Sequence, residues 1–182
     1  MKLPAPTDAE VPFDREKLLA AVHYVIDLCA EDLDRLGKTK LHKVLYFADM
    51  LAFIDTGKPL TGVEYIKEPF GPTARYLGWA IRQLEDAGKI AVTRRRFYGL
   101  EKFDFRLCEK AEYNELGEYE RNLLAVVVDF VCGFSAKEIS EISYDKPWQS
   151  VGLGERIPYA SAFLLLPPRR PSARDIEWAK AG

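Results

Sequence analysis

Residues 38–55 carry apolar side chains on two adjacent stripes of a helix, and this pattern constrains the fold more than any other feature of the chain. A helix that is apolar over so much of its circumference must be covered by other elements on several sides. The sequence therefore predicts a domain built around this helix. The first stripe consists of Leu41, Val44, Leu45, Ala48 and Leu51, and the second stripe consists of Phe47, Met50 and Ile54.

Caps and helix-breaking residues divide the remaining chain into short elements. Pro72 suits the first turn of a helix, where its missing N–H costs nothing, and Ser135 with Glu138 forms a capping box. The alternation after Gly88 predicts an antiparallel hairpin. The predicted fold class is mainly α: a single compact helical domain with a small antiparallel β-hairpin, winged-helix-like in part. The expected helices span 14–37, 38–55, 72–88, 118–132, a short stretch after 135, and 159–164, and the expected extended segments span 63–66, 90–97 and 102–107.

Two of these helices should bury specific apolar residues. On the first helix the buried face is expected to extend as far as Leu33, and the helix itself to end near Gly37. The helix over 118–132 should be largely buried. Its expected inward-facing residues are Leu123, Leu124, Val127, Phe130 and Val131.

The ends of the chain differ in pattern from its middle. Residues 1–12 contain three prolines without periodicity and predict a flexible N-terminal tail. Residues 13–166 form the expected domain, a length that buries roughly 70% of the unfolded-chain surface. Residues 167–182 form the expected C-terminal tail, with a short helix over 172–181.

Composition and charge exclude several classes of function. The net charge is −2, so no overall field attracts nucleic acid or anionic lipid. Cys29, Cys108 and Cys132 are odd in number and far apart in sequence, which argues against a disulfide framework and a zinc site. The longest apolar windows are well short of the ~20 residues that a membrane-spanning helix needs. We expect a cytoplasmic protein without a membrane partner.

The central helix also carries His42, Tyr46 and Asp49, four and three residues apart, which could place a base, a phenol and a carboxylate on one face. Catalysis or metal binding by these three would need further groups, and the only other histidine is His23. The sequence lacks HExxH, a Cys/His cluster, a P-loop and a serine elbow. We therefore expect no enzyme, no catalytic residue, no metal and no cofactor, and we interpret the three side chains as bracing the fold.

Three consecutive arginines, Arg94, Arg95 and Arg96, lie in the first strand of the predicted hairpin. Two helices followed by a hairpin match the order of a winged helix, in which the wing contacts phosphates. The outer face of the helix over 72–88 mixes arginine with acidic residues, which does not favour a recognition helix. Contact with nucleic acid through these arginines remains an alternative to a solvated or protein-facing strand.

Several short motifs occur in a characteristic order. A K-L-x-K-x-L-Y-F-A helix precedes a loop with G-x-P-L and then a Gly-Pro pair, and Pro-Trp follows much later. In this order the chain resembles the SocA-like Panacea domain family, over about residues 17–166, although Tyr144 stands where the family often has histidine. The motif residues, expected to be structural, are Lys40, Leu41, Lys43, Leu45, Tyr46, Phe47, Ala48, Gly57, Pro59, Gly71, Pro72 and Pro147.

The resemblance implies an antitoxin of a type II toxin-antitoxin system, which neutralises a cognate protein toxin by direct binding. Two alternatives stay open: a winged-helix-like DNA-binding regulator, and an adaptor that delivers the toxin to a AAA+ protease. Trp148 either plugs the edge of the core together with Tyr144 or anchors an interface. The expected partner-binding anchors, chosen as aromatic or arginine residues, are Trp79, Arg95, Phe97, Tyr98 and Trp148.

Overall fold

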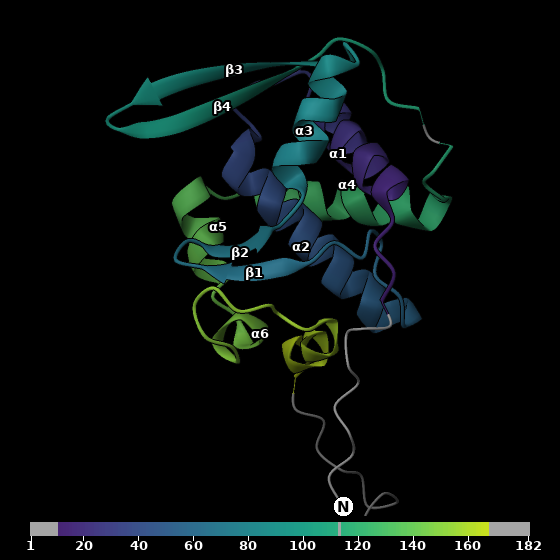
Figure 1. The fold of residues 1–182 in the computed structure, drawn as a ribbon, viewed down its shortest axis with the longest axis vertical. Coiled ribbons are helices and arrows are strands. Elements are labelled where there is room, and N and C mark those ends of the chain that lie inside the picture. Colours follow the sequence, from purple (N-terminus) through teal and green to yellow (C-terminus); the bar gives the residue numbers. More distant parts are fainter. Residues whose placement is uncertain (1–10, 113, 168–182) are drawn as a thin grey trace, which may run out of the picture.

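A computed structural model describes residues 11–112 and 114–167, and its centre is the helix α2 (Gly37–Thr56) (Figure 1). Helices predominate, so the predicted mainly α fold class is confirmed. Two antiparallel hairpins accompany the helices, where the sequence predicted one. The other elements are α1 (Arg15–Leu28), β1 (Tyr65–Glu68), β2 (Gly71–Ala74), α3 (Leu77–Asp86), β3 (Ile90–Phe97), β4 (Leu100–Leu107), α4 (Glu118–Cys132), α5 (Ala136–Ile142), α6 (Lys146–Gln149) and the 3₁₀ helix η2 (Tyr159–Leu165).

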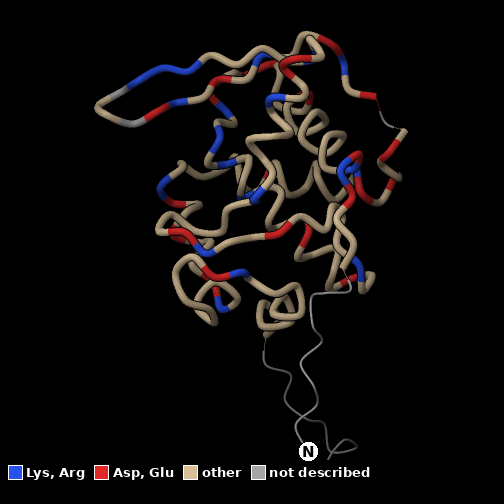
Figure 2. The backbone as a smooth tube through the Cα atoms, in the orientation of Figure 1, with Lys and Arg blue, Asp and Glu red and all other residues tan. Residues whose placement is uncertain are grey.

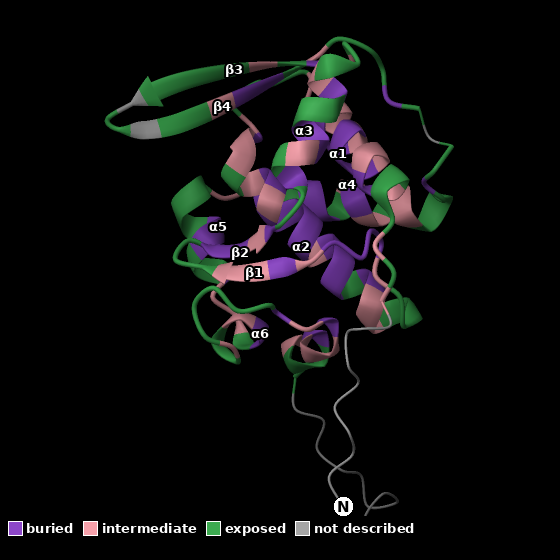
Figure 3. Cartoon of the chain, viewed as in Figure 1, coloured by how far each residue is buried: buried purple, intermediate pink, exposed green. Residues whose placement is uncertain are grey.

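Helix α2 is covered on several sides, as its two apolar stripes predict. It packs against α1, α4, α5, β2, β4 and η2, and most of it is buried (Figure 3). Leu41, Leu45 and Ala48 lie in the core. The prediction was wrong for Leu51, whose side chain is 37% exposed, because it lies near the end of the stripe where the covering elements leave α2 open.

Helix α1 starts where predicted but ends nine residues earlier than expected. The carboxylate of Asp14 accepts a hydrogen bond of 3.0 Å from the backbone N–H of Lys17 and caps the N-terminus. The helix ends at Leu28 instead of near Gly37, and Leu33 is exposed. Asp32 accepts a hydrogen bond of 3.0 Å from the N–H of Asp34, an Asx turn that competes with continued helix.

The hairpin β1–β2 replaces the predicted start of the third helix. Gly71 and Pro72 lie in β2, and Glu68 pairs with Gly71 across the hairpin. Gly71 has a φ of +98°, which is incompatible with a helix, and Pro72 is tolerated because each strand of a two-stranded sheet has a free edge. Helix α3 therefore begins only at Leu77.

The hairpin β3–β4 matches the prediction closely, but its loop is tighter. Phe97 pairs with Leu100, so only Tyr98 and Gly99 form the turn. Both have positive φ, +47° and +80°, as a type I′ turn requires. The base of the hairpin packs on the core through Phe105, while its outer part projects from the body of the molecule (Figures 1 and 3).

Helices α2 and α4 run antiparallel. The rings of Phe47 and Phe130 meet edge to face with centroids 5.9 Å apart, and the Tyr119 hydroxyl donates to Asp55 at 2.9 Å. The buried stripe of α4 contains Leu124, Val127, Val128 and Val131. The prediction that Phe130 faces inward was wrong: it lies beyond the edge of this stripe and is 46% exposed.

The predicted tails fall largely outside the described residues. This applies to residues 1–10 and 168–182, including the predicted helix over 172–181. Val11 packs against the core, and the carbonyl of Pro12 lies so close to Gly62 that a Cβ there would be 2.2 Å from it. Residues 11 and 12 therefore pack against the rest of the fold.

Candidate partner-binding surfaces and the buried motif

The motif segments, distant in sequence, meet beside α2. Lys43 and Tyr46 come from α2 itself, Gly71 from β2, and Asp145 from the residue that precedes α6. Lys43, Tyr46 and Gly71 are buried. This arrangement links the central helix to both the first hairpin and the C-terminal segment.

The carboxylate of Asp145 joins two of these elements. The Tyr46 hydroxyl lies 3.0 Å from each of its oxygens, and the backbone N–H of Trp148 donates to Oδ1 at 3.0 Å. Asp145 is thereby the N-cap of α6 and the partner of α2 at once. Burial raises the pKa of Asp145, against the opposing effect of these donors, and burial also raises the pKa of Tyr46.

Lys43 and Gly71 fit each other closely. The ammonium of Lys43 donates to the carbonyl of Pro72 at 2.9 Å, and burial lowers the lysine pKa to about 8, opposed by the charge of Asp145. A Cβ on Gly71 would lie 2.7 Å from the Lys43 Nζ and 2.2 Å from the Ser143 Oγ. Position 71 thus needs glycine for its positive φ and for space.

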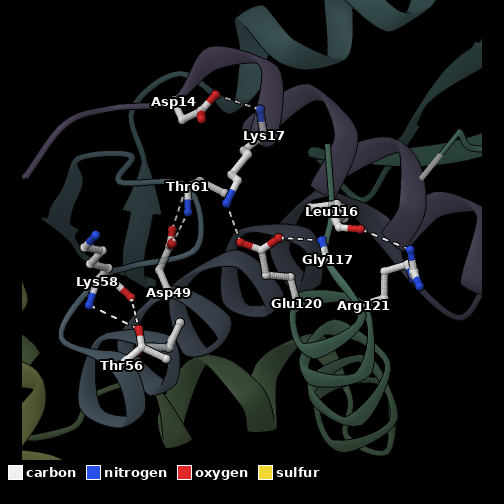
Figure 4. Close-up of polar contacts among 11 residues, drawn as sticks. Asp14, Lys17, Asp49, Thr56, Lys58, Thr61, Leu116, Gly117, Glu120 and Arg121 are labelled. Atoms are coloured by element: carbon white, nitrogen blue, oxygen red, sulfur yellow. Dashed lines mark hydrogen bonds and ion pairs between the residues drawn. The ribbon is translucent and has the colours of Figure 1, made fainter. Parts of the chain in front are cut away.

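Asp49 is fully buried and organises the loop after α2 (Figure 4). Its carboxylate accepts hydrogen bonds of 2.6 Å from the N–H of Thr61, from the Thr61 hydroxyl and from the Tyr65 hydroxyl. Burial raises the pKa of Asp49, while these donors favour the charged form. With its donors already supplied by the protein, this carboxylate fixes the path of residues 61–65.

His42, Tyr46 and Asp49 each have a hydrogen-bond partner elsewhere in the fold. The His42 Nδ1 accepts the backbone N–H of Ala74 at 3.0 Å, and burial lowers the pKa of this histidine to about 3. Each of the three side chains serves a different segment: β2, α6 or the loop after α2. Within residues 11–112 and 114–167, no group of three or more His, Cys, Asp and Glu side chains is arranged to hold a metal ion.

His23, the second histidine, also has a structural bond. It lines a surface hollow of about 340 Å³ between α1, the end of α3 and the segment before α4. Its Nε2 lies 2.8 Å from the carbonyl oxygen of Glu109. Because a carbonyl oxygen can only accept a hydrogen bond, the Nε2–H group is the donor. The ring therefore holds the segment after β4 against α1.

The arginines of β3 are interspersed with acidic groups. Arg95 forms an ion pair with Asp104 on β4, and Arg94 lies 3.6 Å from Glu85 on α3. Arg96 stands opposite Glu101 in the hairpin. Figure 2 shows the basic run on one strand and acidic positions on the other. Two of the three guanidinium groups therefore have carboxylate partners, and contact of this strand with nucleic acid stays a prediction.

The predicted anchors lie in separate regions. Trp79 on α3 is partly buried with the Arg15 guanidinium 5.7 Å from its ring centre. Trp148 packs 4.6 Å from the ring of Tyr144 and beneath the ammonium of Lys67, 4.0 Å away. Tyr98 is 92% exposed at the tip of the β3–β4 hairpin. Figure 1 places this hairpin and α6 at opposite ends of the molecule, so these anchors do not form one patch.

Trp148 fastens α6 to the first hairpin. Its ring nitrogen donates to the carbonyl of Glu68 at 3.2 Å, and the Tyr144 hydroxyl donates to the carbonyl of Pro69 at 3.0 Å. Trp148 therefore packs at the edge of the core, and its role as an interface anchor, the second alternative, stays a prediction. Tyr144, at the position where the family often has histidine, serves here as a hydrogen-bond donor.

An apolar surface that sequence reasoning missed lies where α4 meets the outer side of α2. We call it the α2–α4 face. On α4 its residues follow helical spacing on a stripe separate from the buried one, and this second stripe was the signal available in the sequence. Val126, the most exposed member, has 66% of its surface accessible. The face consists of Phe47, Leu51, Tyr119, Leu123, Val126 and Phe130.

These features define a helical scaffold with an apolar core, a few bonded polar side chains buried beside α2, and several exposed apolar side chains on α4. A family model described as the antitoxin SocA-like Panacea domain matches residues 41–149, and the chain belongs to this family. Membership points to a toxin as partner and to a non-enzymatic role. No curated protein and no solved structure matches the chain. Among the described residues, no helix is long and apolar enough to span a membrane. The comparisons give no support for a nucleic-acid or protease partner.

Proposed function

We propose that this chain is the antitoxin of a type II toxin-antitoxin pair in the cytoplasm, and that it neutralises its toxin by binding it through the α2–α4 face. The observation that supports this proposal is the exposed apolar surface on a chain of an antitoxin family. Contiguous exposed apolar surface is typical of interaction sites in globular proteins.

The shape of the face suits a protein partner. From Tyr119 to Phe130 it follows α4 for about 17 Å, at 1.5 Å per residue. Phe130 also packs edge to face against Phe134, with centroids 5.4 Å apart, so its ring is held in place before a partner arrives. Pre-positioned aromatic side chains lose little entropy on binding and are typical anchors of tight interfaces.

The charges beside the face indicate the chemistry of the partner. Asp55 lies at one end, near Tyr119, and Asp129 lies at the other end, near Phe130; both are exposed. Asp55 accepts a hydrogen bond from the hydroxyl of Tyr119, and Asp129 forms an ion pair with the guanidinium of Arg35. A toxin that docks here should present an apolar patch flanked by basic side chains, since complementary charge speeds and orients association.

A growth assay with the adjacent gene tests this function. The product of the adjacent gene, expressed alone in bacteria, should stop growth, and co-expression of this chain should restore it. The two purified proteins should form a stable complex of fixed stoichiometry. A harmless neighbour, or a toxin that does not bind this chain, would refute the proposal.

The arginine strand supplies a control for the DNA-binding alternative. A variant with Arg94, Arg95 and Arg96 all replaced by alanine should restore growth as well as the natural chain. If the variant still binds the toxin but no longer restores growth, neutralisation by contact alone is wrong. A mobility-shift assay at low salt with promoter DNA completes the control, because phosphate binding is steeply salt-dependent.

A further inference from the structure

Two cysteines that lie 103 positions apart in sequence meet in the fold. Cys29 follows the last residue of α1 and is buried, and Cys132 is the last residue of α4 and is partly buried. Helices α1 and α4 pack against each other, and the two thiols at their ends lie close enough for each to shift the pKa of the other. The third cysteine, Cys108, is exposed after β4, and its thiol lies 3.9 Å from the carbonyl of Arg106 in its own segment.

Cations surround this thiol pair. The Arg35 guanidinium contacts the carbonyl of Leu28 at 3.4 Å and the carboxylate of Asp129 at 2.6 Å, so it bridges the ends of α1 and α4 beside the two sulfurs. Lys40 donates to the carbonyl of Arg35 at 3.0 Å, which brings a second positive charge to the same place. The neighbouring Cys29 thiol, together with Lys40 and Arg35, lowers the pKa of Cys132, whereas the Cys132 thiol and burial raise the pKa of Cys29.

We propose that Cys29 and Cys132 form a reversible redox site, in which a hydroperoxide converts the two thiols into a disulfide between the ends of α1 and α4. The partly exposed Cys132 reacts first as the thiolate, because positive neighbours favour the charged sulfur. The buried Cys29 then acts as the resolving thiol. Cysteine pairs of this kind in reducing compartments are usually redox-active rather than structural.

The chemistry is balanced with hydrogen peroxide as the oxidant. The Cys132 thiolate attacks one peroxide oxygen, the O–O bond breaks, and a sulfenic acid and hydroxide form. The sulfur of Cys29 then attacks the Cys132 sulfur, the S–O bond breaks, and the departing hydroxide takes the Cys29 proton as water. Two thiols and one peroxide give one disulfide and two waters, and the two electrons lost by the sulfurs reduce the peroxide.

The test uses the full chain with Cys108→Ser, which leaves only the proposed pair. Treatment with a small excess of hydrogen peroxide should lower the mass by that of two hydrogen atoms and block both thiols. Peptide mapping should show residues 29 and 132 joined within one chain, and dithiothreitol should restore both thiols. The oxidised chain should unfold at a higher urea concentration than the reduced one, since the cross-link restricts the unfolded state.

Single-cysteine variants identify the attacking thiol. In the same background, Cys29→Ser should accumulate a sulfenic acid on Cys132 that dimedone traps, and Cys132→Ser should react far more slowly at Cys29. Retention of both free thiols under conditions that oxidise Cys108 in the natural chain would overturn the proposal. So would cross-links found only between chains, or a lower urea midpoint after oxidation.

Discussion

The two sides of α2 each carry side chains that are atypical of their surroundings: bonded polar groups within the core and an apolar group at the surface. Its inner side buries Lys43, Tyr46 and Asp49, each of which bonds to a different segment of the chain. Its outer side exposes Leu51 beside the apolar stripe of α4. Buried polar groups are costly unless they are bonded, and exposed apolar surface is costly unless it is covered. The difference teaches that the buried polar side chains of α2 maintain the scaffold, whereas the exposed apolar side chains beside them on α2 and α4 are proposed to bind the partner.

The largest effect should come from the inner side. Replacing Asp49 with alanine leaves the Thr61 N–H, the Thr61 hydroxyl and the Tyr65 hydroxyl without their buried acceptor. Each buried donor that is left without an acceptor typically costs about 1–3 kcal/mol, so we expect a loss of about 3 kcal/mol or more. Urea unfolding should show this decrease in the free energy of unfolding. A change below 1 kcal/mol would show that the cluster is not a structural centre.

Gly71→Ala should be the next most damaging change. The new Cβ would meet Ser143 and Lys43 and would require a strained backbone, so we expect a loss of about 2–3 kcal/mol. Gly57→Ala is the matched control: its φ is also positive, at +75°, but nothing lies within 4 Å of the added Cβ. The control should lose only about 1 kcal/mol. If urea unfolding showed equal losses of stability for Gly71→Ala and Gly57→Ala, crowding by Ser143 and Lys43 would not explain the effect at position 71.

On the outer side, Val126→Glu should separate binding from folding. Val126 is exposed in the middle of α4, and glutamate is a better helix former than valine, so the stability should stay within about 0.5 kcal/mol. A charge inside an apolar interface should weaken the toxin complex by about 30-fold or more, as at a hot spot. Calorimetry measures the affinity. Gln83→Glu, which adds the same charge on α3, should bind normally.

Acid should destabilise the fold through His42. The folded-state pKa of about 3 lies below the unfolded value near 6.5, so the unfolded chain binds more protons between these pH values. Stability from this group is therefore complete above pH 6.5 and declines as the pH falls toward 3, by about 2 kcal/mol at pH 5.

His42→Asn provides the control for this pH dependence. The asparagine oxygen can accept the Ala74 N–H in place of Nδ1 but does not titrate. The variant should lose less stability between pH 7 and pH 5 than the natural chain, as measured by urea unfolding. If the free energy of unfolding fell equally with pH in both chains, a group other than His42 would cause the acid sensitivity.

The smallest effect should come from the hairpin tip. Tyr98→Asn removes an exposed ring, while asparagine readily adopts the positive φ of a type I′ turn. If the α2–α4 face carries most of the binding, toxin affinity should fall less than about 10-fold. If Tyr98→Asn lowered toxin affinity more than Val126→Glu does, the main contact would lie at the predicted hairpin anchors, which include Arg95 and Phe97.

Much of the fold could be predicted because its signals are local. The stripes of α2, the cap at Asp14, the capping box of Ser135 and Glu138, and the alternation of the β3–β4 hairpin each lie within a few residues. Gly71 was predicted wrongly because Gly-Pro also suits a helix start. Its strand depends on Lys43, which is 28 positions earlier in the chain.

The proposed surface and the thiol pair were harder to predict for the same reason. Phe130 fits a buried stripe when α4 is considered alone, and only the packing of α2 along the other stripe shows that it remains outside. Cys29 and Cys132 are separated by most of the domain, so no spacing rule joins them. Sequence periodicity shows that a helix has an apolar side but does not show which apolar side is covered.

Radical footprinting of the toxin complex tests the central claim most directly, because it labels exposed side chains in the natural, fully folded chain. The account predicts that Tyr119, Val126 and Phe130 lose most of their labelling when the toxin binds, while the labelling of Trp148 stays unchanged. Protection confined to the hairpin tip or to α6, with α4 labelled as in the free chain, would contradict it.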